Sequence, residues 1–162
     1  MPARQIQVIQ PTDRVKVVFG AGDEYRYLAT GETTDGEYFL VEAIVPPGGG
    51  PPSHIQTREE EAFYILEGRL TFYGEDSEIE AGPGTYLNIP KGAKHRFRNN
   101  TDTTAKMLFF FAPAGIEGLF DEFSRFDEAD DVADNEPNDD SAAMLTSLNA
   151  IGKNYGVQYV PD

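Results

Sequence analysis

The 162-residue sequence contains no cysteine. Disulfide bonds, thiolate metal sites and cysteine nucleophiles are therefore excluded, and the composition is compatible with a reducing compartment. No apolar run approaches the roughly 18 residues that a membrane helix requires, and the first residues lack the apolar core of a signal peptide. We therefore expect a cytoplasmic protein with no membrane partner.

Basic residues are also scarce: 13 Lys and Arg stand against 28 Asp and Glu, which gives a formal net charge of -15. Such a balance opposes the counterion release that drives nucleic-acid binding, so no nucleic-acid partner is expected. Eight of the acidic residues lie in the segment 127–140, which has no basic residue. We predict a solvated loop or poorly ordered segment there, with an interaction tail as the alternative.

From about residue 5 to 112, short apolar segments alternate with turn residues, which is typical of an antiparallel sandwich or barrel. The expected strands are residues 5–9, 15–19, 24–29, 37–45, 53–56, 61–67, 69–74, 77–80, 85–89, 94–99 and 105–112. Gly68 lies between two of them, where a tight hairpin needs a positive φ. The length fits one domain, 1–162, with a barrel over 5–112 and a helical, acidic C-terminal extension over 113–162.

The spacing of apolar residues after position 113 changes to that of helices. The first predicted helix spans about 115–125, with Ile116, Leu119, Phe120 and Phe123 on one face. Asp140 or Ser141 could cap a second helix that ends near Gly152 or Gly156. Its apolar stripe consists of Met144, Leu145, Leu148 and Ile151. We expect both helices to cover the sheet rather than to bind a partner.

The chain has only two histidines, and each lies near the start of an expected strand. Alternation along a strand directs His54 and Gln56 to the same face. On the 61–67 strand the same rule groups Glu61 with Phe63 and Ile65. A carboxylate at the end of an apolar wall must be neutralised, paired or bound to a metal, because a lone buried charge costs several kcal/mol as an order of magnitude.

The second histidine follows a turn that contains Pro90 and Gly92. On the strand after that turn, His95, Phe97 and Asn99 share a face. An isolated histidine in either place would more often be a structural residue with satisfied hydrogen bonds.

Together, the two stretches resemble the two motifs of the cupin superfamily. The first motif, G-x5-H-x-H-x4-E-x6-G, matches at Gly48, His54, Glu61 and Gly68, with Gln56 in place of the second histidine. The second motif, G-x5-P-x-G-x2-H-x3-N, matches at Gly84, Pro90, Gly92, His95 and Asn99. Flanking segments are similar to small single-domain, quercetin dioxygenase-like cupins. The resemblance implies an all-β fold with C-terminal helices, in which the strands form a cupin barrel (a double-stranded β-helix or jelly roll).

The resemblance also implies that His54, Glu61 and His95 bind one divalent metal ion, which could be Fe, Mn, Ni, Zn or Cu. Gln56 would supply an amide oxygen where cupins place a third histidine, and an amide oxygen is a harder and weaker donor. If that exchange loses one or two kcal/mol, metal affinity falls by about 5- to 30-fold. The alternative is that Gln56 hydrogen-bonds metal-bound water or a substrate.

Other residues near the motifs have simpler interpretations. We expect Glu59 and Glu60 to be solvated loop charges. Four phenylalanines are expected to pack in the aromatic core, with the lining of a pocket as the alternative: Phe63, Phe97, Phe109 and Phe111.

The leading functional hypothesis is a metal-dependent cupin that acts on a small organic molecule, most simply as a quercetinase-like dioxygenase in which Glu61 accepts a proton. One alternative is a non-catalytic binding or sensory module with a degenerate metal site. Another is a non-oxidative isomerase or lyase. Single-domain cupins commonly form dimers, so the resemblance also implies a homodimer.

Overall fold

The computed structural model describes residues 4–129 and 142–162. Its strands are β1 (Val17–Gly20), β2 (Asp23–Ala29), β3 (Phe39–Val45), β4 (His54–Gln56), β5 (Glu60–Glu67), β6 (Leu70–Tyr73), β7 (Glu78–Ala81), β8 (Tyr86–Ile89), β9 (Lys94–Arg98), β10 (Ala105–Ala112) and β11 (Val157–Tyr159). Its helices are α1 (Gly31–Thr34), α2 (Glu117–Ala129), α3 (Ala142–Gly152) and the 3-10 turn η1 (Lys153–Tyr155).

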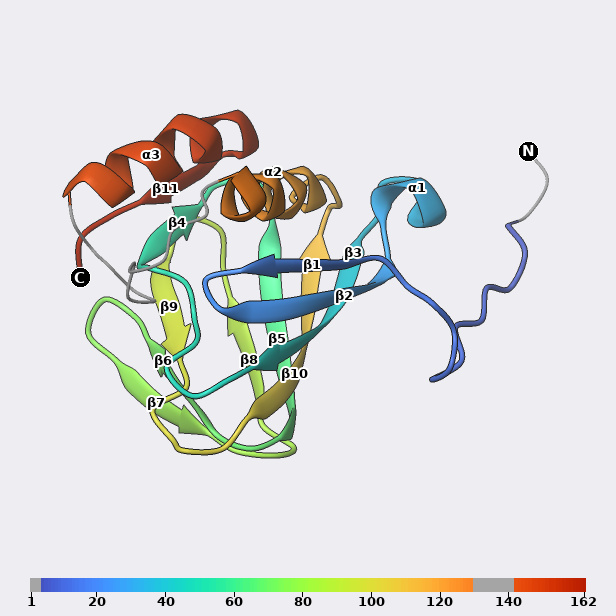
Figure 1. Cartoon of the computed structure of the whole chain (residues 1–162), viewed down its shortest axis with the longest axis horizontal. Coiled ribbons are helices and arrows are strands. Elements are labelled where there is room, and N and C mark those ends of the chain that lie inside the picture. The colour runs from blue at the N-terminus through green and yellow to red at the C-terminus, as the bar shows by residue number, and fades with distance from the viewer. Residues whose placement is uncertain (1–3, 130–141) are drawn as a thin grey trace.

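The strands form two antiparallel sheets that face each other as a jelly-roll barrel (Figure 1). One sheet has the order β1-β2-β3-β10-β5-β8 and the other β11-β4-β9-β6-β7. Strands distant in sequence therefore lie side by side, which the non-consecutive order of a jelly roll requires. The expected all-β fold with C-terminal helices is confirmed.

Alternating side chains give each sheet an apolar inner face. In β3, residues 39, 41, 43 and 45 are buried while the residues between them are only half-buried. Facing strands add aromatic rings: the centroids of Phe63 and Phe109 lie 4.6 Å apart, and those of Phe97 and Phe109 lie 5.4 Å apart. Edge-to-face contacts of this kind stabilise a core by about 0.5–1.5 kcal/mol per pair beyond burial itself.

The two longer helices lie over one end of the barrel (Figure 1). Phe120 of α2 contacts the rings of Phe39 and Phe111, so α2 closes this end of the core. Both predicted helices are present, although α2 runs to Ala129 and so includes the first residues of the acidic segment. The remainder of that segment, and the expected caps Asp140 and Ser141, lie outside the described residues. In the described parts of the chain no helix is long and apolar enough to cross a membrane.

The turn predictions agree with the backbone. Gly68 has a φ of 73° between β5 and β6. Its position also excludes a side chain, because a Cβ there would lie 2.7 Å from the Ala105 Cα. This glycine therefore serves both the hairpin geometry and the close approach of β10.

The prediction of a strand at residues 5–9 is wrong. These residues have no regular structure, and Ile6 and Val8 are exposed. The alternating pattern is present, but none of the strands in the described residues pairs with the segment, and a segment without ladder hydrogen bonds is not a strand.

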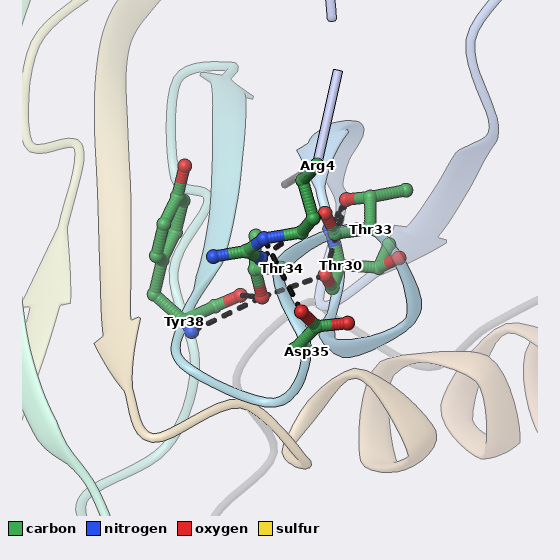
Figure 2. A network of polar contacts seen from close by, with 6 residues as sticks. All are labelled: Arg4, Thr30, Thr33, Thr34, Asp35 and Tyr38. Atoms are coloured by element: carbon green, nitrogen blue, oxygen red, sulfur yellow. Dashed lines mark hydrogen bonds and ion pairs between the residues drawn. The ribbon is translucent and has the colours of Figure 1, made fainter. Parts of the chain in front are cut away.

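Just before β3 the chain makes the short helix α1, which lies between two of the expected strands. Figure 2 shows how it is tied together: the Thr34 hydroxyl lies 2.7 Å from the Tyr38 carbonyl oxygen and accepts a hydrogen bond from the Tyr38 amide at 3.2 Å. Arg4 forms an ion pair with Asp35 at 3.3 Å, which attaches the N-terminal segment to this corner.

Candidate metal centre

Two neighbouring strands of the five-stranded sheet carry the two histidines. His54 begins β4 and lies directly opposite His95 of β9 in the antiparallel register. Glu61 lies near the start of β5 in the other sheet, where alternation directs it inward together with Phe63. Both sheets thus contribute to one cluster inside the barrel, as the resemblance to the cupin motifs implies.

The possible ligand atoms of His54, Glu61 and His95 all lie within 4.8 Å of one another, and all three side chains are buried. The two imidazole centroids are 4.3 Å apart. A divalent metal holds nitrogen and oxygen ligands at about 2.0–2.2 Å, so two ligands of one ion are at most about 4.4 Å apart. Small side-chain rotations would therefore place all three donors on one ion.

Backbone carbonyls hold both imidazoles in one orientation. His54 Nδ1 lies 2.9 Å from the Pro52 oxygen, and His95 Nδ1 lies 3.0 Å from the Ala93 oxygen. Because a carbonyl can only accept, each Nδ1 carries a proton and each Nε2 is left to face the cluster. This is the arrangement that outer hydrogen bonds impose on metal-binding histidines.

The pKa values of the two histidines are shifted in opposite directions. Burial and the neighbouring His95 lower the pKa of His54 to about 4, so its ring is neutral at neutral pH. Burial alone would also lower the pKa of His95, but the attraction and hydrogen bond of Glu61 raise it above its ordinary value. Both ring nitrogens of His95 contact acceptors, and a proton is shared between His95 Nε2 and Glu61. A divalent cation bound here would replace that proton.

Gln56 lies on the same inward face of β4 as His54 and is buried. Its Nε2 has no hydrogen-bond partner among the described residues. The amide is close enough to His54 to affect the pKa of that ring. Ligation of a metal by Gln56 stays a prediction.

The expectation that Glu59 is a solvated charge is wrong, because its side chain is only 3% exposed. The chain bends at Thr57 and Arg58, both exposed, and this bend turns Glu59 inward before β5 begins. Burial raises the pKa of Glu59, against the opposing effect of the nearby Gln56 amide. Glu60 is exposed, as expected. One feature of the sequence could have indicated the inward position of Glu59: it lies two residues before Glu61, so strand alternation places both on the same face.

Two tyrosines that were not expected at the site lie close to the cluster. The ring of Tyr159, in β11, is 5.7 Å from the ring of His54 and 5.9 Å from that of Phe123 in α2. The Tyr25 hydroxyl donates to Asp23 at 3.0 Å. Burial and then Asp23 raise the pKa of Tyr25, with smaller effects from Tyr159 and Glu61, so this hydroxyl faces the same interior.

Asp23 is a second unforeseen buried carboxyl group, with no exposed surface. Burial raises its pKa to about 8, against hydrogen bonds from Tyr25 and the Gly50 backbone. A Cβ on Gly49 would lie 2.3 Å from Asp23 Oδ1, so the glycine-rich loop before β4 can pack on this carboxyl group only without a side chain. The spacing of Asp23 from Tyr25 gives the inward direction, but nothing in the sequence marks the contact with the loop.

A pocket of about 460 Å³ lies beside the centre, between the β6–β7 and β8–β9 turns. Its walls include Phe72, Ile79, Leu87, Asn88, Lys94 and His95. The four phenylalanines named from the sequence are at most 3% exposed and pack in the core: Phe63, Phe97, Phe109 and Phe111. A contribution of these rings to a substrate pocket stays a prediction.

A family model described as a cupin domain matches residues 41–111, which contain all four motif positions of the centre. The chain is 33% identical over 105 residues to quercetin 2,3-dioxygenase of Bacillus subtilis, a match that covers 64% of this chain but only 30% of that protein. The chain therefore spans less than a third of the length of that relative.

Two further proteins match over more of their length. Protein SchB of Streptomyces halstedii is 34% identical over 57% of this chain and 67% of its own. The structure of the polyketide cyclase RemF from Streptomyces resistomycificus is 28% identical, with a TM-score of 0.58 over 67% of this chain and 80% of that one. The barrel, the paired motifs and these relatives agree, and the chain belongs to the cupin superfamily.

Proposed function

We propose that this cupin binds one divalent metal ion through His54, Glu61 and His95 and acts on a small organic molecule. The observation that carries the proposal is the convergence of two Nε2 atoms and one carboxylate in a buried cluster within 4.8 Å. Two histidines and one carboxylate form the ligand set that non-haem iron enzymes use, and they leave coordination positions open. The metal would be Fe, Mn, Ni, Zn or Cu, and the Gln56 amide oxygen would supply the fourth donor.

Dioxygenase chemistry is the first candidate reaction, supported by the identity with quercetin 2,3-dioxygenase. A divalent metal held by these residues would supply Lewis-acid chemistry and would couple an enol or hydroxy-carbonyl substrate electronically to molecular oxygen. Glu61 has two carboxylate oxygens, so one can bind while the other accepts the hydroxyl proton of the substrate. The Tyr159 ring packs against His54 and Phe123 on one side of the cluster. The adjacent 460 Å³ pocket has the volume of a typical small-molecule site.

A second candidate is a non-oxidative reaction such as ring closure, supported by the likeness to the polyketide cyclase RemF. The names of these two relatives, a quercetin dioxygenase and a polyketide cyclase, support a small organic substrate for either reaction. A non-catalytic binding module is the third candidate, because the second histidine of the motif is replaced by Gln56. Oxygen consumption with a flavonol separates the first candidate from the others, and product formation without oxygen identifies the second.

Metal analysis tests the proposal directly. Protein purified without a histidine tag or chelator should contain close to one divalent metal per chain, and His54→Ala or His95→Ala should empty the site. Glu60→Gln is the matched control, because it changes an exposed carboxylate next to Glu61. Native protein with an intact fold and no affinity for divalent metals would contradict the proposal.

We also propose a homodimer formed through the outer face of the six-stranded sheet. Tyr64, Tyr86 and Phe110 are exposed there on adjacent strands, with Tyr64 directly opposite Tyr86 in the register. Tyr38 stacks on Phe110 at 5.4 Å and extends the patch. An aromatic sheet face of this kind is typical of a surface covered by a second copy. The single-domain organisation and the cytoplasmic location stay predictions.

A further inference from the structure

The barrel has an unpaired seam between β7 and β8. The strand β8 ends the six-stranded sheet and β7 ends the five-stranded sheet, and no ladder of hydrogen bonds joins these two edges in the described residues. The 460 Å³ pocket lies along the seam, because its walls include Ile79 from β7 and both Leu87 and Ile89 from β8. The pocket is therefore a gap between the edges of the two sheets, open to a ligand from the side of the barrel.

Ile79 shows that the seam is an unfilled part of the apolar interior. It lies opposite Phe72 in the register of β6 and β7 and two residues before Ala81, and both of those side chains are buried. Alternation directs Ile79 to the same inner face, yet its side chain is 46% exposed. An apolar group placed in the seam would give Ile79 the burial that its neighbours already have.

The pocket also borders the candidate metal centre. His95 forms part of its wall. Ile89, on the other side of the seam, lies directly opposite Glu61 in the register of β5 and β8, so the two side chains share a face of the sheet. A ligand bound along the seam therefore has one end beside two of the three candidate metal ligands.

The walls of the pocket suit a neutral apolar ring. Apart from His95, the lining has one basic and one acidic side chain, Lys94 and Glu75. The Lys94 amine already donates to the Pro161 oxygen at 2.9 Å. Phosphate and carboxylate ligands are held by charge-assisted hydrogen bonds from cationic side chains, and the net charge of -15 opposes the approach of an anion. An aromatic ring needs no such partner and gains from contact with aliphatic side chains.

We propose that the seam between β7 and β8 binds an aromatic ring of the substrate, with the oxygen-bearing edge of that ring towards His95 and Glu61. The inference rests on the proposed function. It selects neutral compounds in which a fused or attached ring extends beyond the oxygens that approach the metal. Ile79 and Ile89 are then specificity residues, with no part in metal binding or in the reaction itself.

Two probes with the same pair of adjacent hydroxyls test this proposal: catechol, with one ring, and 2,3-dihydroxynaphthalene, with a second, fused ring. Zinc-loaded protein is used without oxygen, so that neither probe is oxidised, and dissociation constants are measured by calorimetry. We expect the naphthalene compound to bind about 10- to 30-fold more tightly, because its second ring is buried in the seam. Ile79→Ser should reduce this ratio to about threefold or less, with zinc content and catechol affinity maintained. Ile79→Val keeps an aliphatic side chain and should retain most of the preference.

The matched control is Ile9→Ser, because Ile9 is 44% exposed and lies outside the pocket. This variant should keep the wild-type ratio. Equal affinity of the wild-type protein for both probes would overturn the inference and leave the metal proposal intact, as would a wild-type ratio in the Ile79→Ser variant. Zinc-loaded protein that binds neither probe would overturn the inference together with the proposed action on a small organic molecule.

Discussion

His95 Nε2 lies 2.7 Å from Glu61 Oε2, and neither side chain is more than 4% exposed. This contact joins the two sheets at the candidate metal centre. A carboxylate buried so deeply depends on the cation opposite it, because truncation of one partner leaves an unpaired charge in the interior.

The first prediction concerns that pair. His95→Ala should destabilise the metal-free protein by about 3–5 kcal/mol, since Glu61 would then be buried without a cation. The double variant His95→Ala/Glu61→Gln should recover part of the loss. Urea unfolding in the presence of a chelator measures both, and equal stability of the single and double variants would refute the charge explanation.

A second prediction concerns Gln56. Gln56→His should restore a third imidazole and raise zinc affinity by about 5- to 30-fold. Competition with a chelating dye measures the affinity, and a drop in metal affinity would show that the neighbouring side chains accept only an amide at this position.

The buried Asp23 carboxyl group should make the free energy of unfolding depend on pH. Its pKa is about 8 in the folded protein against an ordinary value of 3.8, so the folded state binds this proton more tightly than the unfolded state does. The stability that comes from this proton is complete below about pH 4 and is lost as the pH rises to 8, a change of about 6 kcal/mol at most.

Asp23→Asn should therefore flatten the decline in unfolding free energy between pH 5 and pH 8. Denaturant unfolding at several pH values tests this. Asp76→Asn, at an exposed position, serves as the matched control and should follow the wild type. An identical decline in the Asp23→Asn variant would place the titrating group elsewhere.

Two variants of Tyr159 should separate the contribution of its ring to stability from the contribution of its hydroxyl group. Tyr159→Ala removes a ring that lies between His54 and Phe123, and should cost about 3–5 kcal/mol of stability. Tyr159→Phe keeps the ring and should cost less than 1.5 kcal/mol. Thermal unfolding compares the two, and a large loss in the phenylalanine variant would assign the stabilisation to the hydroxyl.

The proposed dimer face gives the last prediction. Tyr64→Lys should convert the dimer to a monomer, because it places a charge among exposed aromatic rings. Ile79→Lys changes a similarly exposed residue on the other sheet and should leave the assembly unchanged. Sedimentation velocity distinguishes the two, and a monomeric wild-type protein would rule out the dimer.

The β-rich architecture and the face on which His54, Glu61 and His95 lie could be predicted from strand alternation. That the three residues come together was implied by the resemblance to the cupin motifs. The match is close for β10, expected at 105–112 and observed as Ala105–Ala112. These features depend on local periodicity, which a single sequence records directly.

Residues that reach the site through tertiary contacts could not be predicted from the sequence as easily. Glu59 becomes buried because the bend before β5 packs against the turn around Gly156, about 100 positions later in the chain. Tyr159 approaches His54 only because β11 pairs with β4. The wrong strand prediction at residues 5–9 has a related cause: the pattern is strand-like, but none of the described strands pairs with the segment.

The pairing of β11 with β4 places the strand that carries His54 between β9, from the second motif, and β11, from the C-terminal segment. Contacts between residues so distant in sequence form late in folding, because closing a long loop costs entropy before any contact is gained. The centre should therefore acquire its final form only after the rest of the barrel has assembled. Metal uptake would then report completed folding, and shortened chains that lack residues 157–159 should keep much of the barrel yet bind metal poorly.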